Sequence, residues 1–240
     1  MLSAWFEYTD LYLAQGLALL KVGAHPTQII ELPTTLPWDK ALVRVRETLE
    51  HVKASAPAPK RLRVMLSGGL CPPFPIQAPQ EARSWEDLQQ LLPLSASAVL
   101  SVQADRLECR QEFSGQPLGM ASSASLIQAL ETWAEESKLK IQGIQPSWSV
   151  ASQSRLARAK QVEALQISEH DGTTLLVSKG TEWLCAHIDA TGNHAQAGVR
   201  RYLTGWDVNE ETLLQLGFEA ASAAPSLDGL TSWAGHWRKV

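Results

Sequence analysis

The sequence predicts an α/β fold in which one arrangement of strands and helices occurs twice, the second time in a shortened form. Residues 61–74, RLRVMLSGGLCPPF, alternate apolar and polar side chains and then meet Gly68-Gly69 and Pro72-Pro73, which is typical of a core strand that enters a sharp turn. A run of short alternating segments opens the chain and recurs after residue 162. Of the 240 residues, 45% are apolar and 19% are charged, enough to bury a sizeable core.

Three strands are expected at the start of the chain, with a turn at Thr9-Asp10 and an interruption at Gly16: residues 2–7, 11–20 and 28–32. A helix then follows, because apolar residues recur at a spacing of three and four: Ala41, Leu42, Val45, Leu49 and Val52. Two prolines in residues 54–60 end this helix, and the strand 61–66 returns.

The middle of the chain predicts two further helices and three strands. Ser84 is a good N-cap for a short helix that Pro93 closes, and residues 98–102 and 107–113 are expected to be strands. Ser123 or Ser125 caps the next helix, whose apolar stripe is Leu126, Ile127, Leu130, Trp133 and Ala134. A strand at residues 140–144 completes this part.

The opening pattern then begins again. Residues 163–168, 173–178 and 182–188 read as strands, with a hairpin signal at Asp171-Gly172 between the first two. A helix is expected at 209–221 and an irregular tail at 223–240. We therefore divide the chain into a first half (1–148), a basic connector (149–161), a partial second half (162–222) and the tail.

The predicted order is three meandering strands followed by alternating helices and strands, begun a second time. This is the plan of a ribonuclease-H-like half, and two such halves make the actin-like fold. The second copy is expected to be truncated.

Composition excludes several functional classes. A net charge of −4 provides no basic field for nucleic acid. Three distant cysteines make neither a disulfide framework nor a zinc site. The N-terminal residues do not resemble a signal peptide, and no run of 18 apolar residues occurs, so a cytoplasmic protein without direct membrane insertion is expected.

The first chemical hypothesis is nucleotide binding, since actin-like ATPases hold phosphates where the first strand pair of each half turns. The first-half turn, placed at residues 7–11, has no glycine that would let a phosphate approach the backbone. The second-half turn, Asp171-Gly172-Thr173-Thr174, has suitable residue types. A plain hairpin followed by strand residues is the alternative reading, and we expect no bound cofactor.

Other reactive residues have simpler interpretations. Ser67 lacks the frame of a nucleophile elbow and is read as a turn serine, and Cys71 is read as a buried structural thiol. His187 and His194, with Asp189 between them, do not have the spacing of known ligand sets. We expect no metal site and no catalytic residue.

Two segments are candidates for binding a protein partner. In the loop 71–79, Phe74 and Ile76 lie among four prolines and either border a peptide groove or close the end of the core. Trp233 and Trp237, in the glycine-broken tail, are the second candidate surface.

The chain resembles the actin-like assembly proteins of type IV pilus and type II secretion systems, the PilM-like proteins and the cytoplasmic domains of GspL-like proteins. The resemblance is carried by the duplicated plan, by RLRVMLSGGLCPPF and by the second meander, VEALQISEHDGTTLLVSKGTEWLCAHI. It implies a scaffold at the inner membrane that binds the cytoplasmic tail of a bitopic assembly protein. PilM-like relatives also bind ATP.

The function expected from this resemblance is therefore a non-enzymatic cytoplasmic scaffold, peripheral to the inner membrane through its partners, with a degenerate nucleotide site. Self-association is a further option. The alternative is a nucleotide-binding or ATP-hydrolysing actin-like protein that uses the turn at Asp171.

Overall fold

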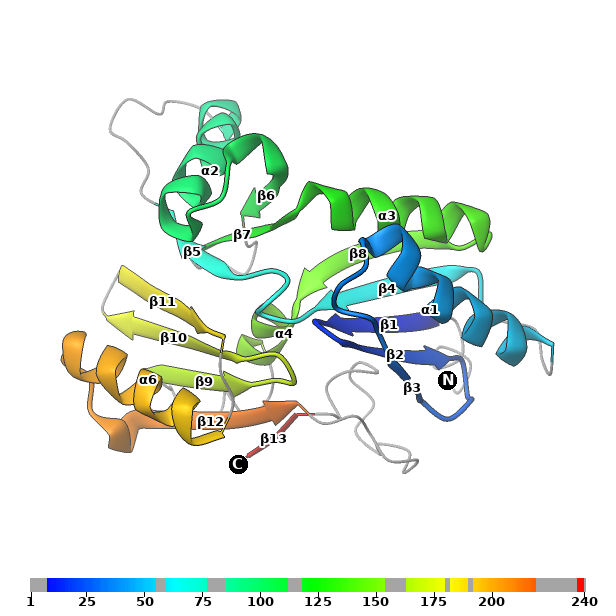
Figure 1. Ribbon diagram of the computed structural model, residues 1–240. Helices are drawn as coiled ribbons and strands as arrows, with labels where there is room; N and C mark the ends of the chain where they lie inside the picture. Colours follow the sequence, from blue (N-terminus) through cyan, green and yellow to red (C-terminus); the bar gives the residue numbers. More distant parts are fainter. Residues whose placement is uncertain are drawn as a thin grey trace, which may run out of the picture.

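The computed structural model describes residues 8–54, 59–76, 85–111, 118–153, 163–179, 182–189, 192–218 and 237–239. Two five-stranded sheets lie side by side, and a smaller three-stranded sheet is attached to them (Figure 1). The first five-stranded sheet has the order β3-β2-β1-β4-β8, and the second has the order β11-β10-β9-β12-β13. The same order of strands therefore occurs twice, as the sequence predicts.

The first sheet contains β1 (Tyr8–Ala14), β2 (Leu17–Val22), β3 (Gln28–Glu31), β4 (Arg61–Leu66) and β8 (Lys140–Pro146). The strands β1, β4 and β8 run parallel to one another, and β1, β2 and β3 form an antiparallel meander. Helices α1 (Trp38–Lys53) and α3 (Ala124–Glu136) pack together on one face, over the alternate residues Leu62, Val64 and Leu66 of β4. Both helices, and the strand that they cover, are as predicted.

The expected turn at Thr9-Asp10 is wrong. Both residues lie inside β1, and the chain turns at Gln15-Gly16, where Gly16 adopts a φ of +84° that favours glycine. Asp10 faces away from the helices and is 3% exposed, because Arg63 of β4 binds both of its carboxylate oxygens at 2.7 and 3.1 Å. A paired charge can be buried within a strand, and for that reason a polar dipeptide was mistaken for a turn.

The three-stranded sheet, β5-β7-β6, carries one helix. Its elements are β5 (Pro73–Pro75), α2 (Trp85–Leu100), β6 (Leu107–Gln111) and β7 (Leu118–Ser123), with a short 3₁₀ helix η2 (Ala104–Arg106) before β6. Two predictions fail here, since α2 continues through Pro93 and residues 98–100 of the strand expected at 98–102 are the last residues of this helix. The strand β7 was not anticipated.

The second sheet contains β9 (Ala164–Ser168), β10 (Thr173–Lys179), β11 (Glu182–Ile188), β12 (Leu213–Phe218) and β13 (Trp237–Lys239). Helix α6 (Gly192–Gly205) packs on one face, and α4 (Ser147–Ser152) lies on the other (Figure 1). The meander is as predicted. The expected helix at 209–221 is wrong, because a 3₁₀ helix η3 (Glu210–Thr212) leads into β12, and the expected irregular tail contains β13.

The second half is the shorter one. After β4, the first half adds the small sheet, α3 and the seven-residue parallel strand β8. After β12, the described part of the chain adds only β13, three residues long and antiparallel to β12.

Phe74 belongs to the core of the small sheet and is 0% exposed, so it does not border a groove as one of our two readings expected. Its ring lies against the backbone of Gly119, where an added Cβ would come within 2.2 Å. Ile76 is half-buried against the same cluster. For Phe74 the other reading, a residue that closes the core, is the one that the structure supports.

We expect Phe74→Ala to lower the free energy of unfolding by about 3–5 kcal/mol, the usual loss for a buried phenylalanine. Leu94→Ala, on exposed α2 surface of the same subdomain, should change it by less than about 0.5 kcal/mol. Urea denaturation of the two variants measures both values. Equal, small effects would contradict the placement of Phe74 in the core.

Candidate functional site

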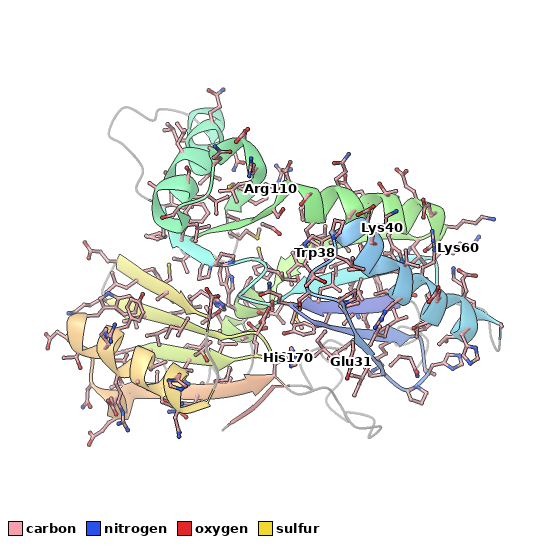
Figure 2. The ribbon with its side chains drawn as sticks, viewed as in Figure 1. Glu31, Trp38, Lys40, Lys60, Arg110 and His170 are labelled. Atoms are coloured by element: carbon pink, nitrogen blue, oxygen red, sulfur yellow. The ribbon has the colours of Figure 1, made fainter. Side chains whose placement is uncertain are left out.

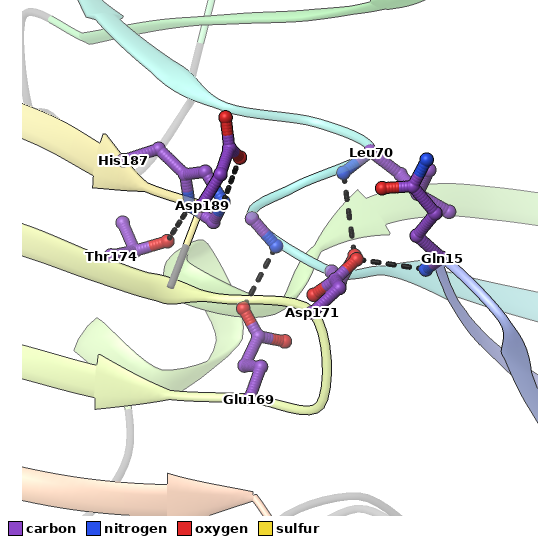
Figure 3. A network of polar contacts seen from close by, with 9 residues as sticks. Gln15, Leu70, Glu169, Asp171, Thr174, His187 and Asp189 are labelled. Carbon is purple, nitrogen blue, oxygen red and sulfur yellow. Dashed lines mark hydrogen bonds and ion pairs between the residues drawn. The ribbon is translucent and has the colours of Figure 1, made fainter. Parts of the chain in front are cut away.

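The two halves meet at the turn between β9 and β10. This turn, residues 169–172, lies against the β1–β2 turn and against the loop that follows β4 (Figure 3). His170 lies between the two sheets, near Gly16 (Figure 2). The nucleotide hypothesis places phosphates at this junction, so the partners of its polar groups decide what it can bind.

Asp171 occupies the centre of the junction. Its Oδ2 accepts a hydrogen bond from the Gln15 backbone N–H at 2.8 Å and another from the Ser67 hydroxyl at 2.5 Å (Figure 3). The β1–β2 turn therefore does offer a backbone donor and a glycine, contrary to our reading of residues 7–11. That donor is bound to a carboxylate of the protein itself.

Glu169 makes the second set of contacts and is 7% exposed. Its Oε2 accepts from the Gly68 N–H at 2.8 Å, and its Oε1 accepts from the Tyr12 hydroxyl at 3.0 Å. Burial raises the pKa of Glu169 to about 7, against the opposing effect of the Gly68 N–H. The ring of Tyr12 also packs against Phe218 in a tilted arrangement, with the ring centroids 4.3 Å apart, which ties this network to β12.

His187 of β11 closes the network on its other side. Its Nδ1 lies 3.1 Å from the Thr174 hydroxyl, and its Nε2 lies 3.3 Å from Asp189 Oδ1 without the alignment of a hydrogen bond. Burial lowers the pKa of His187, although Asp189 and Asp171 raise it. An aspartate, a histidine and a threonine in a row suggest a nucleophile, but Thr174 is fully buried and no substrate reaches its hydroxyl.

The two halves approach so closely because the loop after β4 contains two glycines. A Cβ on Gly68 would lie 2.0 Å from Thr174 Oγ1, and one on Gly69 would lie 2.7 Å from Asp171 Oδ2. The glycines that mark the end of the β4 strand in the sequence therefore make room for the turn of the second half.

These contacts bear directly on the predicted nucleotide site. Of the residues proposed for it, Asp171 is bonded to the first half, and Thr173 and Thr174 are buried strand residues of β10. Asp171-Gly172 is a hairpin turn, closed by the bond from the Glu169 N–H to the Gly172 carbonyl at 2.8 Å. One amide donor of each first-half loop, that of Gln15 and that of Gly68, is thus bound to a carboxyl group of the chain.

The remaining candidates take structural positions. Cys71 is buried and burial raises its pKa to about 12, so it is an unreactive thiol. Its carbonyl accepts from the Trp148 indole N–H at 2.8 Å, which ties α4 to the first half. His194 is exposed on α6, apart from His187. Within the described ranges no three potential ligands are grouped around a metal position.

The partner-surface candidates in the tail are only partly described. Trp237 lies in β13, opposite Phe218 of β12, whereas Trp233 lies outside the described residues. No helix among the described residues has the length and apolarity needed to cross a membrane.

One groove of about 590 Å³ lies between α1 and α3, away from the junction of the halves. Trp38 and Trp133 line it together with the ion pair between Arg46 and Glu136. Figure 2 shows Trp38 and Lys40 at the beginning of α1. Of the described residues that we predicted for nucleotide or partner binding, none lines this groove.

No protein-family model and no curated protein sequence matches the chain. Solved structures match most of it. A Bacteroides thetaiotaomicron protein with an actin-like ATPase fold and unknown function superposes with a TM-score of 0.60 at 9% identity, over 92% of this chain and 86% of that one. The cytoplasmic domain of EpsL, an inner-membrane component of the type II secretion system of Vibrio cholerae, gives 0.53 at 14%, over 88% and 82%.

A chain of the PilM–PilN type IV pilus biogenesis complex gives a TM-score of 0.55 at 11% identity, over 85% of this chain and 67% of that one. At such identities a likeness establishes the fold. The predicted actin-like fold is confirmed, and the predicted resemblance to pilus and secretion proteins is confirmed at the level of the fold.

Gly68→Ala should disrupt the junction, because the new methyl group meets Thr174, His187 and Glu169 at once. We expect a loss of about 1–3 kcal/mol or more in the free energy of unfolding, the usual cost of overpacking. Gly143→Ala in β8, where an added Cβ meets nothing within 4 Å, is the matched control. If both variants melt like the wild type, the close approach of the halves is wrong.

The raised pKa of Glu169 predicts a pH dependence. The folded state holds the proton up to about pH 7, while the unfolded chain releases it near its ordinary value, so this group's contribution to stability is lost as pH rises between about 5 and 7. Glu169→Gln cannot ionise. Relative to that of the wild type, the free energy of unfolding of Glu169→Gln should therefore rise by roughly 3 kcal/mol between pH 5 and pH 8.

Chemical denaturation of both proteins across this pH range measures the difference. Taking the difference removes the contributions of Asp171, His187 and Asp189, which are present in both proteins. A mutational effect that is independent of pH would show that Glu169 ionises normally in the folded state.

Proposed function

We propose that this chain is a non-enzymatic actin-like scaffold, cytoplasmic and peripheral to the inner membrane, in the assembly platform of a type IV pilus or type II secretion system. In this role it binds the cytoplasmic tail of a membrane-anchored protein and places that protein in the assembly. Its own chemistry is limited to protein contacts.

The observation that carries the proposal is the junction between the halves. Two carboxylates, from Asp171 and Glu169, hold the backbone N–H groups of Gln15 and Gly68 that face the junction. A phosphate group would have to displace both carboxyl groups from these donors and would meet the negative charge of Asp171. The fold is thus retained while its nucleotide position is filled from within, which suits a scaffold.

The structural neighbours support the same role. One comes from an inner-membrane component of a secretion system and another from a pilus biogenesis complex with a second protein. A third is described by an actin-like ATPase fold without a known function. Two of the three therefore come from machinery for secretion or pilus biogenesis.

Two measurements test the proposal. Mg-ATP at millimolar concentration should leave the melting temperature unchanged, whereas a ligand at a hundred times its Kd would add about 2.7 kcal/mol of stability. Fluorescently labelled synthetic peptides, copying the cytoplasmic tails of bitopic inner-membrane proteins encoded beside this chain, should include at least one that binds in anisotropy titrations.

A scrambled peptide of the same composition is the control for the tails. A stabilising shift with Mg-ATP that is lost in Asp171→Ala would favour the alternative, a nucleotide-binding protein. If none of the tails of the proteins encoded beside this chain binds, the result contradicts the scaffold function.

A further inference from the structure

The duplicated fold lets one half serve as a reference for the other. In the first sheet, the outer edge of β4 is covered by β8 through six paired positions, from Arg61 to Leu66. In the second sheet, β12 is the counterpart of β4, since it lies parallel to the first strand of its own meander. Its outer edge is covered by β13 through only three positions, Leu216, Gly217 and Phe218.

In the described part of the chain, the other half of β12 has an uncovered outer edge. Among the described residues, no strand pairs with Leu213, Leu214 and Gln215 on the side away from β9. The strand itself, LLQLGF, carries no charge, and Leu214 and Leu216 are anchored in the core. A well-fixed strand with a free backbone edge is the usual acceptor for an added strand.

We propose that the outer edge of β12 is the docking site for the partner tail, which adds to the second sheet as an extended strand and takes the place of β13. This inference rests on the proposed function and states where and how the tail binds. The chain's own β13 indicates the direction, because it already lies antiparallel on this edge.

The register and the charges define the kind of segment that fits. An antiparallel strand that continues past Leu216 runs along Gln215, Leu214 and Leu213 and then reaches Glu210 and Glu211. Both glutamates are exposed. Arg200 Nε lies 3.7 Å from Glu210 Oε1, and the carboxylate of Glu211 adds a second negative charge at this end. The site therefore suits about six extended residues followed by Lys or Arg. Cytoplasmic tails of inner-membrane proteins carry such residues near the membrane.

The test changes β13 without touching β12. Arg238→Pro removes one backbone donor from β13 and weakens its hold on the edge, while Arg238→Ala keeps the donor and is the matched control. The probe is the labelled tail peptide that binds in the anisotropy titration. We expect at least threefold tighter binding to Arg238→Pro and an unchanged Kd for Arg238→Ala. Bound tail should also slow hydrogen exchange at Leu213–Gln215.

The charged end is tested separately. Glu210→Lys with Glu211→Lys should weaken binding about tenfold at low salt, whereas Glu182→Lys on the opposite edge of the sheet should have little effect.

Each outcome has one meaning. A tail that binds all variants equally and leaves β12 exchange unchanged overturns the edge as the site but keeps the scaffold function. If no tail binds any variant, the result contradicts the scaffold function and, with it, this inference. A dimer of Arg238→Pro in light scattering, formed without the tail, would assign the edge to a second copy and overturn the proposal.

Discussion

Two carboxylates of one turn, Asp171 and Glu169, hold the halves of this protein together. They accept hydrogen bonds from backbone groups of the β1–β2 turn and of the loop after β4, and from the hydroxyls of Ser67 and Tyr12. Such bonds are strong because the acceptors are charged or buried. The glycines after β4 leave the space that the turn enters, and Tyr12 packs against Phe218 beside it.

Much of the fold follows from apolar spacing alone. The stripes of α1 and α3, the strand β4 and the second meander all have regular patterns, and the duplicated order could be derived from them. The expected strand at 2–7 lies outside the described residues, and the turn expected at Thr9-Asp10 is wrong because burial of an ion pair puts a charged residue inside β1. The helix α2 was cut at Pro93 because a proline is expected to end a helix, although tertiary contacts of the small sheet sustain this one.

In the second half, local sequence patterns leave the type of some elements undetermined. The sequence LLQLGF fits a helix or a strand, and its pairing with β9, about fifty residues earlier, makes it a strand. The helix α6 was missed although Ala195, Val199 and Leu203 recur every four residues, because its polar face and glycines dominate the composition. Asp171 was singled out for phosphate chemistry, whereas Glu169 drew no attention, since only the three-dimensional structure brings Gly68 to it.

At the junction, carboxyl groups of the chain itself occupy backbone donors that a bound anion could otherwise use. A nucleotide is held in proportion to its concentration in the cell, but a carboxylate on the same chain is present at a fixed, high effective concentration and does not diffuse away. Under the proposed scaffold function, the relation between the two halves is therefore independent of the energy supply of the cell and of any cycle of binding and release. An assembly built on such a component has a constant geometry at that point, and any motion it requires has to come from another subunit.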